Sequence, residues 1–258
     1  MDNSMNRGLK KKLQEGQSVI GPFIKAANPA LVEILGLSGM DYVLFDLEHS
    51  PVSMEELENL IRAADAVGTC SIVRVASRSE SDILHALDKG PGGVLVPMVS
   101  SREAAVSVVN HCRYAPIGQR GVDIYSRAAR FGYTPKDDYF LKVNDEVMIA
   151  VQIEGKEGVD NLDEILSVES IDIIYVGPYD LSQSLGVPGQ IRDPRVVSKI
   201  EEIAHKVKER GRFVGIYVDN VETAHYYANL GVQFITLSVD IRIFSEACNS
   251  VVKEFRER

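Results

Sequence analysis

Short apolar runs alternate along this chain with stretches in which apolar residues recur at helical spacing. Short apolar runs, typical of buried strands, occur at residues 18–27, 41–49, 70–76, 92–98, 147–154, 170–181, 213–219 and 233–240. Stretches with helical spacing follow them at 28–38, 79–90, 101–113, 155–168, 220–231 and 241–258. Two further helical stretches have one clear boundary each: one begins at residue 53 and the other ends near residue 211. Eight strands alternating with eight helices, at a repeat of about 30 residues, predict an α/β fold, the (β/α)8 TIM barrel. The pattern contains no linker, so we expect residues 1–258 to form a single domain.

Two segments lie outside this repeat. Residues 4–15 have the pattern of a short basic helix, which we expect to lie across one end of the barrel. Residues 116–135 are irregular and rich in Gly, Arg and Tyr, and such a long loop in a compact domain is usually functional or mobile. The first turns after the strands lack a glycine-rich dinucleotide motif, which argues against an open Rossmann sheet.

Composition limits the partners and the compartment. The formal net charge of −9 argues against nucleic acid or an anionic membrane as a main partner, because either favours a basic surface. Cys70, Cys112 and Cys248 lack metal-ligand spacing, so we expect reduced thiols, as in the cytoplasm. The first residues lack the apolar core of a signal peptide, and no apolar run has the length of a membrane span. These features predict a soluble cytoplasmic protein.

The clearest candidate chemistry lies between residues 147 and 180. Two apolar runs joined by one helical stretch predict a βαβ unit, whose strands are parallel and adjacent. Glu154 and Asp180 stand at the carboxyl ends of these strands, and adjacent strands are about 5 Å apart. The two carboxylates could therefore bind one hard divalent cation, such as Mg2+ or Mn2+, completed by water and substrate oxygens. The alternative is that both acids cap the helices that follow.

More polar residues stand at the predicted carboxyl ends of strands, where barrel enzymes place their active sites. They are Asp46, Glu48, His49, Arg74, Gln152 and Asp240. His49 could exchange a proton near neutral pH or could be a solvent-facing loop residue. Arg74 interrupts an apolar strand, so its charge needs an anionic partner, which could be Asp46, Glu48 or a substrate. Asp88 could orient a histidine or could be a solvated helix residue.

A Schiff-base mechanism would need a lysine at the end of a strand. The run at 170–181 contains none, and Lys25, at the end of the first strand, is the only candidate. Metal-assisted enolisation therefore fits these residues better than an imine does.

Several motifs occur in the order found in one known family. They are DYVLFDLEHSP, VRV with Arg74, GVLVPMVSS, RYAPIGQRGV, VQIE and VGPYDLS. From about Gly21 to Phe255 the chain closely resembles the HpcH/HpaI family of pyruvate-dependent class II aldolases, whose members act on 4-hydroxy-2-oxo acids of the dehydrodeoxyglucarate and hydroxyoxoheptanedioate types. The resemblance implies a carbon–carbon lyase that yields pyruvate and an aldehyde through a metal-stabilised pyruvate enolate.

The resemblance also implies roles for individual residues. Glu154 and Asp180 would bind the divalent ion, Mg2+, Mn2+ or Co2+. The substrate-binding residues would be Gln152, Gly177, Pro178 and Tyr179, with the backbone N–H of Tyr179 on the substrate carboxylate.

Catalysis and assembly can be inferred in the same way. By resemblance His49 is the base, Asp88 is the acid that raises its basicity, and Arg74 holds the enolate oxygen. Family members are homo-oligomers, commonly hexamers built as a trimer of dimers, and residues 241–258 would form a C-terminal helix swapped within a dimer.

Two positions depart from the family pattern. Leu47 stands where members usually have glycine, beside His49, and Lys25 stands near the barrel mouth where members usually carry a small residue. Either could change the aldehyde or the reaction. The alternative function is therefore other chemistry on the same site, as in an oxaloacetate decarboxylase, a synthase or a citryl-CoA-type lyase. For a thioester substrate, Arg127 and Arg130 of the long loop are the only basic candidates. A barrel that only binds a metabolite would be expected to have lost the metal and base residues, which are all present.

Overall fold

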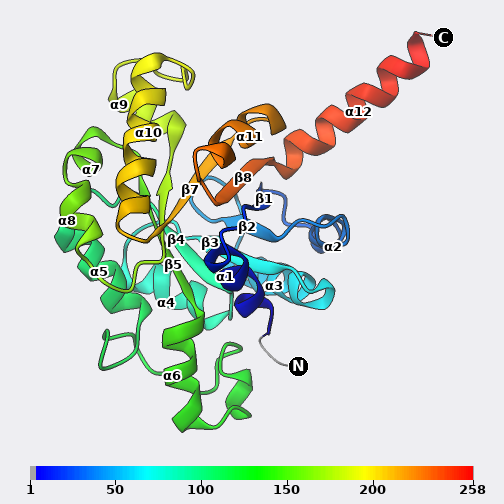
Figure 1. The fold of residues 1–258 in the computed structure, drawn as a ribbon. Helices are drawn as coiled ribbons and strands as arrows, with labels where there is room; N and C mark the ends of the chain where they lie inside the picture. The colour runs from blue at the N-terminus through cyan, green and yellow to red at the C-terminus, as the bar shows by residue number, and fades with distance from the viewer. Residues whose placement is uncertain (1–3, 258) are drawn as a thin grey trace.

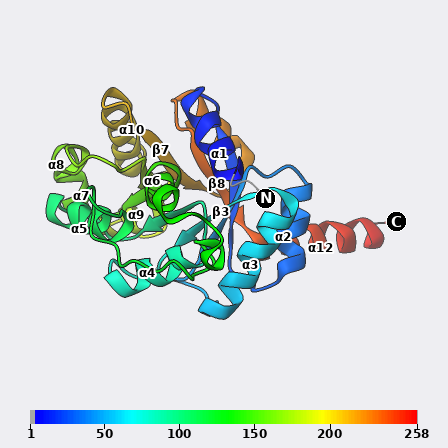
Figure 2. The ribbon, with the colours of Figure 1, turned by 90° about the horizontal axis from the view of Figure 1, so that it is seen from below.

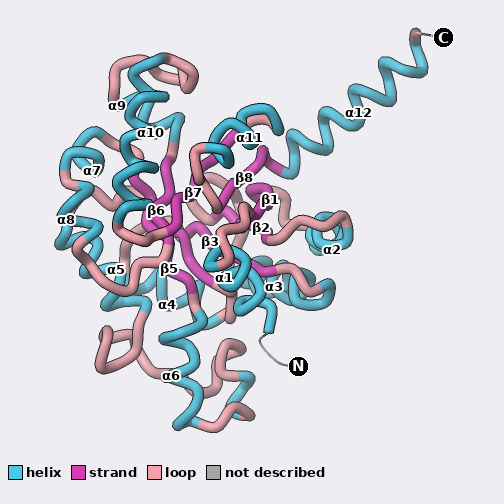
Figure 3. The backbone as a smooth tube through the Cα atoms, in the orientation of Figure 1, coloured by secondary structure: helices cyan, strands magenta, loops and turns pink. Residues whose placement is uncertain are grey.

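The protein is an eight-stranded parallel barrel. The computed structural model describes the backbone of residues 4–257 and the side chains of 8–136 and 139–257. The strands pair in chain order and the eighth pairs with the first, so the sheet closes (Figure 1, Figure 3). They are β1 Val19–Ile24, β2 Tyr42–Asp46, β3 Cys70–Arg74, β4 Gly93–Val96, β5 Met148–Ile153, β6 Ile173–Val176, β7 Phe213–Val218 and β8 Phe234–Val239. The predicted (β/α)8 TIM barrel is confirmed.

Helices surround this barrel. They are α1 Ser4–Gln14, α2 Pro29–Leu37, α3 Met54–Val67, α4 Glu80–Asp88, α5 Arg102–Cys112, α6 Lys136–Glu146, α7 Lys156–Asp160, α8 Leu162–Leu166, α9 Pro178–Ser184, α10 Pro194–Glu209, α11 Val221–Asn229 and α12 Asp240–Arg256, with a 3-10 turn at Arg130–Gly132. The sequence pattern did not predict α6 or α9. α6 begins without a side-chain cap, and α9 begins in a run whose apolar residues continue those of β6. The helical stretch at 155–168 is two short helices, α7 and α8.

Side chains alternate along each strand between the barrel interior and the layer under the helices. One cluster fills the interior: Val19, Phe23, Tyr42, Leu44, Cys70, Ile72, Leu95, Met148, Ala150, Ile173, Tyr175 and Phe234. The intervening strand residues pack against the helices in a second, larger cluster. Since side chains fill the barrel itself, a ligand site has to lie at one of its ends.

α1 closes the amino-terminal end of the barrel. Leu9 and Leu13 belong to the interior cluster and are 3% and 1% exposed. Lys12 pairs with Asp41 at 2.6 Å, and Gln233 Nε2 donates to the carbonyl oxygen of Leu13 at 2.7 Å. The predicted helix across one end is confirmed, and it leaves the carboxyl ends of the strands open.

The long irregular stretch lies at the amino-terminal end as well. Arg127 donates to the carbonyl oxygen of Lys89 and pairs with Asp65. These partners stand at the carboxyl ends of α4 and α3, which run back toward the starts of the strands. Arg127 therefore does not line the barrel mouth, and the role considered for Arg127 and Arg130 in binding a thioester there is not supported.

α12 leaves the barrel as a projecting arm, which two perpendicular views show (Figure 1, Figure 2). Asp240, at its base, is the one buried residue of this helix. Among the residues that the structure describes, no helix combines the length and the apolar character needed to cross a membrane.

Candidate active site

Strand alternation brings polar side chains to the carboxyl-terminal rim of the barrel. Each follows an interior position of its strand by an even number of residues, so it points inward. These residues are Lys25, Asp46, Arg74, Gln152, Glu154, Tyr217 and Asp219. Asp240 joins them from the first turn of α12, after a register shift between β1 and β8. The active sites of barrel enzymes lie at this rim.

Arg74 is held tightly in the middle of this group. Its Nε and Nη2 donate to Asp46 at 2.9 and 2.8 Å, and its Nη1 lies 3.2 Å from Glu48 Oε2. The guanidinium also lies 4.5 Å above the centre of the Phe23 ring. Burial opposes the ionisation of Asp46, but hydrogen bonds and charge from Arg74 lower the pKa of its carboxyl. The structural partner considered for Arg74 is thus present, and a guanidinium has more N–H donors than these contacts use.

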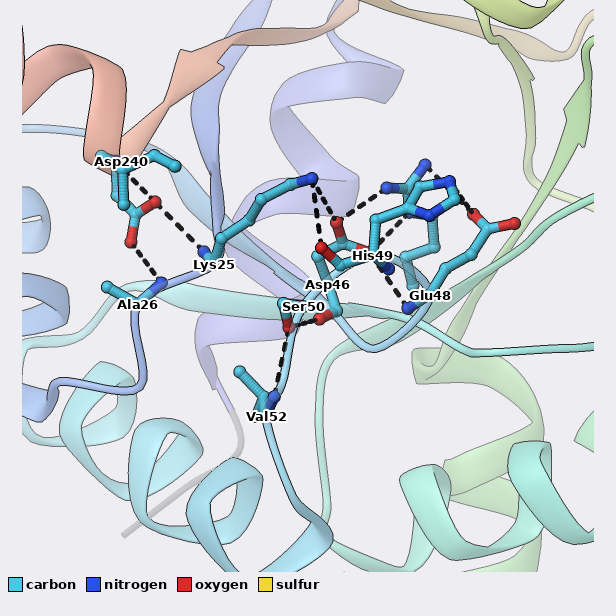
Figure 4. Close-up of polar contacts among 10 residues, drawn as sticks. Lys25, Ala26, Asp46, Glu48, His49, Ser50, Val52 and Asp240 are labelled. Atoms are coloured by element: carbon cyan, nitrogen blue, oxygen red, sulfur yellow. Dashed lines mark hydrogen bonds and ion pairs between the residues drawn. The ribbon is translucent and has the colours of Figure 1, made fainter.

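Lys25 enters the same cluster from the end of β1 (Figure 4). Its Nζ lies 3.3 Å from Asp46 Oδ2 and 3.4 Å from the carbonyl oxygen of His49. On the other side, the Asp240 carboxylate accepts the backbone N–H groups of Lys25 and Ala26 at 3.1 and 2.9 Å. An ammonium engaged with a carboxylate is not the free amine that an imine requires, so this contact disfavours a Schiff base.

The ends of β5 and β6 approach each other closely. Gln152 Nε2 donates to Glu154 Oε2, and the backbone N–H of Met98 donates to Glu154 Oε1 at 2.7 Å. A Cβ on Gly177 would lie 2.9 Å from Gln152 Nε2 and 3.1 Å from Glu154 Cβ, so only glycine fits there without movement. Gln152 Oε1 is buried and has no hydrogen-bond partner, which leaves it able to accept one from a ligand.

The two predicted metal acids do not cap the helices that follow them. α7 and α9 begin after Gly155 and Gly177, and neither start has a side-chain cap hydrogen bond. The carboxylate of Glu154 instead accepts hydrogen bonds from the side chain of Gln152 in β5 and from the backbone N–H of Met98. Asp180 lies in the first turn of α9. The capping alternative is therefore wrong for Glu154, whereas Asp180 stands where an acid favours a helix N-terminus although it makes no side-chain cap hydrogen bond.

Three acids at this place influence one another. Burial raises the pKa of Glu154 against the hydrogen bonds that it accepts, and the charges of Asp180 and Glu48 raise it further. Burial also raises the pKa of Glu48, opposed by Arg74. A cation held by Glu154 and Asp180 would relieve this repulsion.

No group of three or more His, Cys, Asp or Glu side chains that could hold a metal ion occurs in the described part of the chain. The protein alone would therefore supply two carboxylates, and water and substrate oxygens would supply the remaining ligands. Magnesium commonly binds in this way. The residues present fit a hard divalent ion, since both Glu154 and Asp180 would bind it through carboxylate oxygens.

A cavity of about 70 Å³ opens beside these groups. It is lined by Arg74, Gln152, Tyr175, Gly177, Pro178, Tyr179, Asp180 and Tyr217. The structure thus brings the predicted arginine, the predicted glutamine and the β6–α9 turn to one space. A larger cleft of about 360 Å³, between the starts of α10 and α11, shares Pro178 and Tyr217 with it.

Residues 19–247 match the sequence profile of a family described as HpcH/HpaI aldolase/citrate lyase. The chain belongs to this family. A 2-keto-3-deoxy-L-rhamnonate aldolase of Salmonella gallinarum is 34% identical over 257 residues, which cover 99% of this chain and 96% of that protein. The solved structure of citrate synthase SbnG is also 34% identical, with a TM-score of 0.87 and coverage of 96% of this chain and 98% of that one. A family member from Burkholderia cenocepacia is 30% identical, with a TM-score of 0.92 and coverage of 96% and 99%.

Membership of the HpcH/HpaI family confirms the resemblance found in the motifs. It also confirms the prediction of an enzyme of the carbon–carbon lyase class, because the family comprises aldolases and citrate lyases.

His49 and Asp88, which the family resemblance pairs, are not brought together in this chain. Asp88 is the last residue of α4, at the amino-terminal end of the barrel, where Arg120 Nη2 donates to its Oδ1 at 2.8 Å. His49 follows β2 at the opposite end, with 59% of its side chain exposed, and its Nε2 lies 3.8 Å from Glu48 Oε2. Within one chain the His49 imidazole therefore lies by Glu48, and the predicted orientation of His49 by Asp88 is not formed.

Sequence reasoning missed a polar group at the end of β7. Asp219 accepts hydrogen bonds from the hydroxyls of Tyr179 at 3.0 Å and Tyr217 at 3.1 Å, and it pairs with Arg242 at 3.0 Å. Tyr217 lines the cavity beside Arg74. The alternation of β7 was a usable signal, because Tyr217 and Asp219 continue its inward-facing positions.

Proposed function

We propose that this protein is a divalent-metal-dependent aldolase that cleaves a 4-hydroxy-2-oxo acid to pyruvate and an aldehyde, or forms the acid from these two compounds. One observation carries the proposal: Arg74, Gln152 and Asp180 line a single cavity, and Glu154 is bonded to Gln152 at its edge. The family and its named aldolases support this chemistry. The ion would be Mg2+, Mn2+ or Co2+.

The chain's own residues would position the 2-oxo acid. Glu154 and Asp180 would hold the ion, which supplies positive charge beside the substrate oxygens when bound. Gln152 offers a buried amide oxygen without a partner, and the backbone N–H of Tyr179 opens α9 beside the same cavity. The N–H of Tyr179 would donate to the substrate carboxylate, whereas Gln152 Oε1 can only accept and would bind a hydroxyl or a water at the ligand.

Arg74 would stabilise the negative charge that develops on the substrate, and His49 would accept the proton that the substrate loses. In cleavage, His49 would take the proton of the C4 hydroxyl, the C3–C4 bond would break, and an aldehyde would leave. The remaining pyruvate enolate carries negative charge on its C2 oxygen, where the unused N–H donors of Arg74 would stabilise it. Asp46 and Glu48 hold the guanidinium in place for this role, so it needs little reorganisation during the reaction.

Pyruvate proton exchange tests the proposal most directly. Protein stripped with EDTA and placed in deuterium oxide should not exchange the C3 protons of pyruvate, and added Mg2+, Mn2+ or Co2+ should restore exchange, measured by proton NMR. Glu154→Ala and Asp180→Ala should lower the metal-restored rate by at least about 100-fold, a loss of roughly 2.7 kcal/mol. Circular dichroism would show that both variants remain folded, since Asp180 is exposed and Glu154 lies at a strand end.

Two outcomes would contradict this function. Exchange that persists in EDTA would exclude the metal role and would direct attention to an imine on Lys25. Protein that remains inactive with every ion would exclude enolate formation altogether. A variant at Asp163, an exposed acid far from the rim in α8, is the matched control: Asp163→Ala should exchange at the wild-type rate.

A second candidate function is a synthase or related reaction on the same enolate site. The observation that favours it is the citrate synthase SbnG, which is as similar in sequence to this chain as the rhamnonate aldolase is. Assays of oxaloacetate with an acetyl thioester, and of oxaloacetate alone for decarboxylation, would separate these reactions from aldol cleavage. Product formation from the thioester that exceeds the rate with any aldehyde would favour the synthase.

The partner proposal is a second copy of the chain. α12 projects from the barrel and exposes large apolar side chains in one stripe: Ile241, Phe244, Val251, Val252 and Phe255. An exposed apolar stripe of this size marks an interface. We infer that the protein is a homo-oligomer, by family resemblance a hexamer built as a trimer of dimers, in which this helix packs on another subunit.

A further inference from the structure

Asp219 follows β7 at the rim and makes several contacts there, and the proposed aldol mechanism does not use it. Its Oδ2 accepts a hydrogen bond from the Tyr179 hydroxyl at 3.0 Å, and its Oδ1 accepts one from the Tyr217 hydroxyl at 3.1 Å. Arg242 Nη1 lies 3.0 Å from the same Oδ1. One carboxylate at the end of β7 therefore joins three elements, α9, β7 and α12.

Both tyrosines that Asp219 holds line the cavity proposed for the 2-oxo acid. Tyr179 and Tyr217 form part of its wall together with Arg74. Tyr217 also lines the neighbouring cleft of about 360 Å³, so its ring stands between the two spaces. A change in the orientation of either ring would therefore change the shape of the cavity, and Tyr217 could open it to the cleft.

Ring packing alone holds these two side chains weakly. Tyr179 is 44% exposed, and its ring centre lies 5.9 Å from that of Tyr217. On its other side, the Tyr217 ring centre lies 6.0 Å from that of Phe23. Both separations fall in the longer part of the range of about 4.5–7 Å for aromatic pairs. The hydrogen bonds to Asp219 therefore select the orientation of each ring that the structure shows.

The two hydroxyl contacts contribute more to this positioning than the ion pair does. Arg242 is exposed and also pairs with Glu246 at 2.8 Å, and an exposed ion pair contributes little. Asp219 is mostly buried, and a hydrogen bond to a carboxylate is stronger than one between neutral groups. Arg242 supplies the opposite charge, and the tyrosine hydroxyls transmit the position of the carboxylate to the cavity.

We propose that Asp219 is a positioning residue of the active site, which fixes Tyr179 and Tyr217 as walls of the 2-oxo acid cavity. The inference rests on the proposed aldolase function. Tyr179 also carries the backbone N–H proposed to bind the substrate carboxylate, so release of its side chain would loosen that contact as well. Asp219 does not line this cavity itself. Its removal should therefore weaken the binding of pyruvate and leave the chemical step unchanged.

Pyruvate C3–H exchange at a saturating concentration of the restoring ion tests the proposal, because it gives kcat and KM separately. Asp219→Ala should raise the KM for pyruvate by about 10-fold, the effect of one hydrogen bond to a charged group. Its kcat should stay within about threefold of the wild-type value. Asp219→Asn keeps one acceptor oxygen for two hydroxyl groups, so its KM should lie between those of the wild type and Asp219→Ala. Asp219→Asn also carries the test if Asp219→Ala does not fold.

A matched control and a double-mutant cycle identify the tyrosines as the route of the effect. Glu246→Ala removes another acid that pairs with Arg242 and should keep the wild-type KM. Tyr179→Phe/Tyr217→Phe keeps both rings and removes both hydroxyl groups, so it should raise KM as Asp219→Ala does. In that background, Asp219→Ala should raise KM by less than about twofold more, because the contacts that it removes are already absent.

Oxalate binding gives a readout that requires no turnover. Oxalate is planar and carries carboxylate oxygens like pyruvate, but it has no C3 proton to exchange. Its Kd, measured by calorimetric titration in the presence of Mg2+, should rise in Asp219→Ala by about the same factor as the KM for pyruvate. The Mg2+ concentration that gives half-maximal exchange should stay at the wild-type value, since Asp219 is not one of the proposed metal ligands.

Three results would overturn the proposal. The first is a KM for pyruvate and a Kd for oxalate that do not change in Asp219→Ala. The second is an equal increase of KM in the Tyr179→Phe/Tyr217→Phe background, which would mean that the charge of Asp219 acts on the ligand directly. The third is a loss of kcat with a changed Mg2+ requirement, which would place the effect at Asp180. Absence of exchange in the wild type with every ion is the failure of the aldolase function itself, and the oxalate titration would still decide whether Asp219 positions the cavity.

Discussion

At the scale of the residue, the Arg74–Asp46 pair is a buried ion pair of the rim. Asp46 is fully buried and Arg74 is 7% exposed, so both charges depend on each other for solvation. Removal of one partner from a buried ion pair leaves the other charge buried and unpaired. This lowers the unfolding free energy far more than the loss of an exposed pair does. The pair is therefore a requirement of the fold, and it holds the guanidinium that is proposed to stabilise the enolate.

Asp46→Asn should therefore destabilise the protein by about 3–5 kcal/mol in urea unfolding at neutral pH. Asp163→Asn, which touches an exposed pair with Lys206 and Arg210, should cost less than about 1 kcal/mol. A small loss in Asp46→Asn would mean that Glu48 alone can hold Arg74.

The pH dependence of this contribution has a definite sign. The pKa of Asp46 in the folded protein is lowered from 3.8, so the folded state binds a proton at Asp46 less readily than the unfolded chain does. Its ionisation stabilises the fold above pH 3.8, and this stabilisation is lost as pH falls through the lowered folded pKa. Urea titrations at neutral pH and below pH 3.8 should show the difference between wild type and Asp46→Asn shrinking with acid.

Single residues were predictable from sequence where alternation and position agree. Arg74, Gln152 and Glu154 stand at strand ends on inward positions, and the structure places them there. Asp88 was not predictable in this way, because its role came from resemblance alone, and the end of α4 lies at the far end of the barrel from His49.

At the scale of the element, α1 is the part whose role follows most directly from its pattern. Leu9 and Leu13 are one helical turn apart, so they face the same side and enter the barrel interior together. The other residues of the helix whose side chains the structure describes, at 8, 10–12 and 14, are exposed or ion-paired at the surface. Its contribution should therefore be separable from that of the rim.

Leu13→Ala should lower the unfolding free energy by about 2–5 kcal/mol, because Leu13 is 1% exposed and the interior cannot collapse fully onto the space left. Leu37→Ala, on a side chain that is 78% exposed, is the matched control and should change it by less than about 0.5 kcal/mol. Urea unfolding measures both. Pyruvate exchange in folded Leu13→Ala should remain near the wild-type rate, and a large loss would mean that the two barrel ends are coupled.

Helix boundaries were the weaker part of the sequence prediction. α3 was predictable because Ser53 and Glu56 form a capping box, which the structure contains. α6 has no such signal, since Pro135 caps it without a side-chain hydrogen bond. α9 was hidden because its apolar residues continue those of β6, and periodicity cannot separate a short helical turn from the end of a strand.

At the scale of the whole molecule, α12 is the feature that a single barrel does not account for. Its apolar stripe has no cover within the described chain, whereas the opposite face is polar. Val251→Asp should therefore weaken self-association and shift the mass measured by multi-angle light scattering toward the monomer. Ser250→Asp adds the same charge on the polar face and should leave the mass unchanged. A wild-type protein that is monomeric at micromolar concentration would contradict the proposed assembly.

Asp240 has a consequence for how such a protein can change over evolutionary time. Its carboxylate accepts hydrogen bonds from the backbone N–H groups of residues 25 and 26, and these bonds do not involve the side chain of residue 25. A substitution at position 25 therefore leaves these two backbone contacts intact, whereas a substitution at position 240 removes them. A lineage that retains Asp240 keeps a position at the barrel mouth, in contact with the His49 carbonyl oxygen, where selection can try new side chains one substitution at a time.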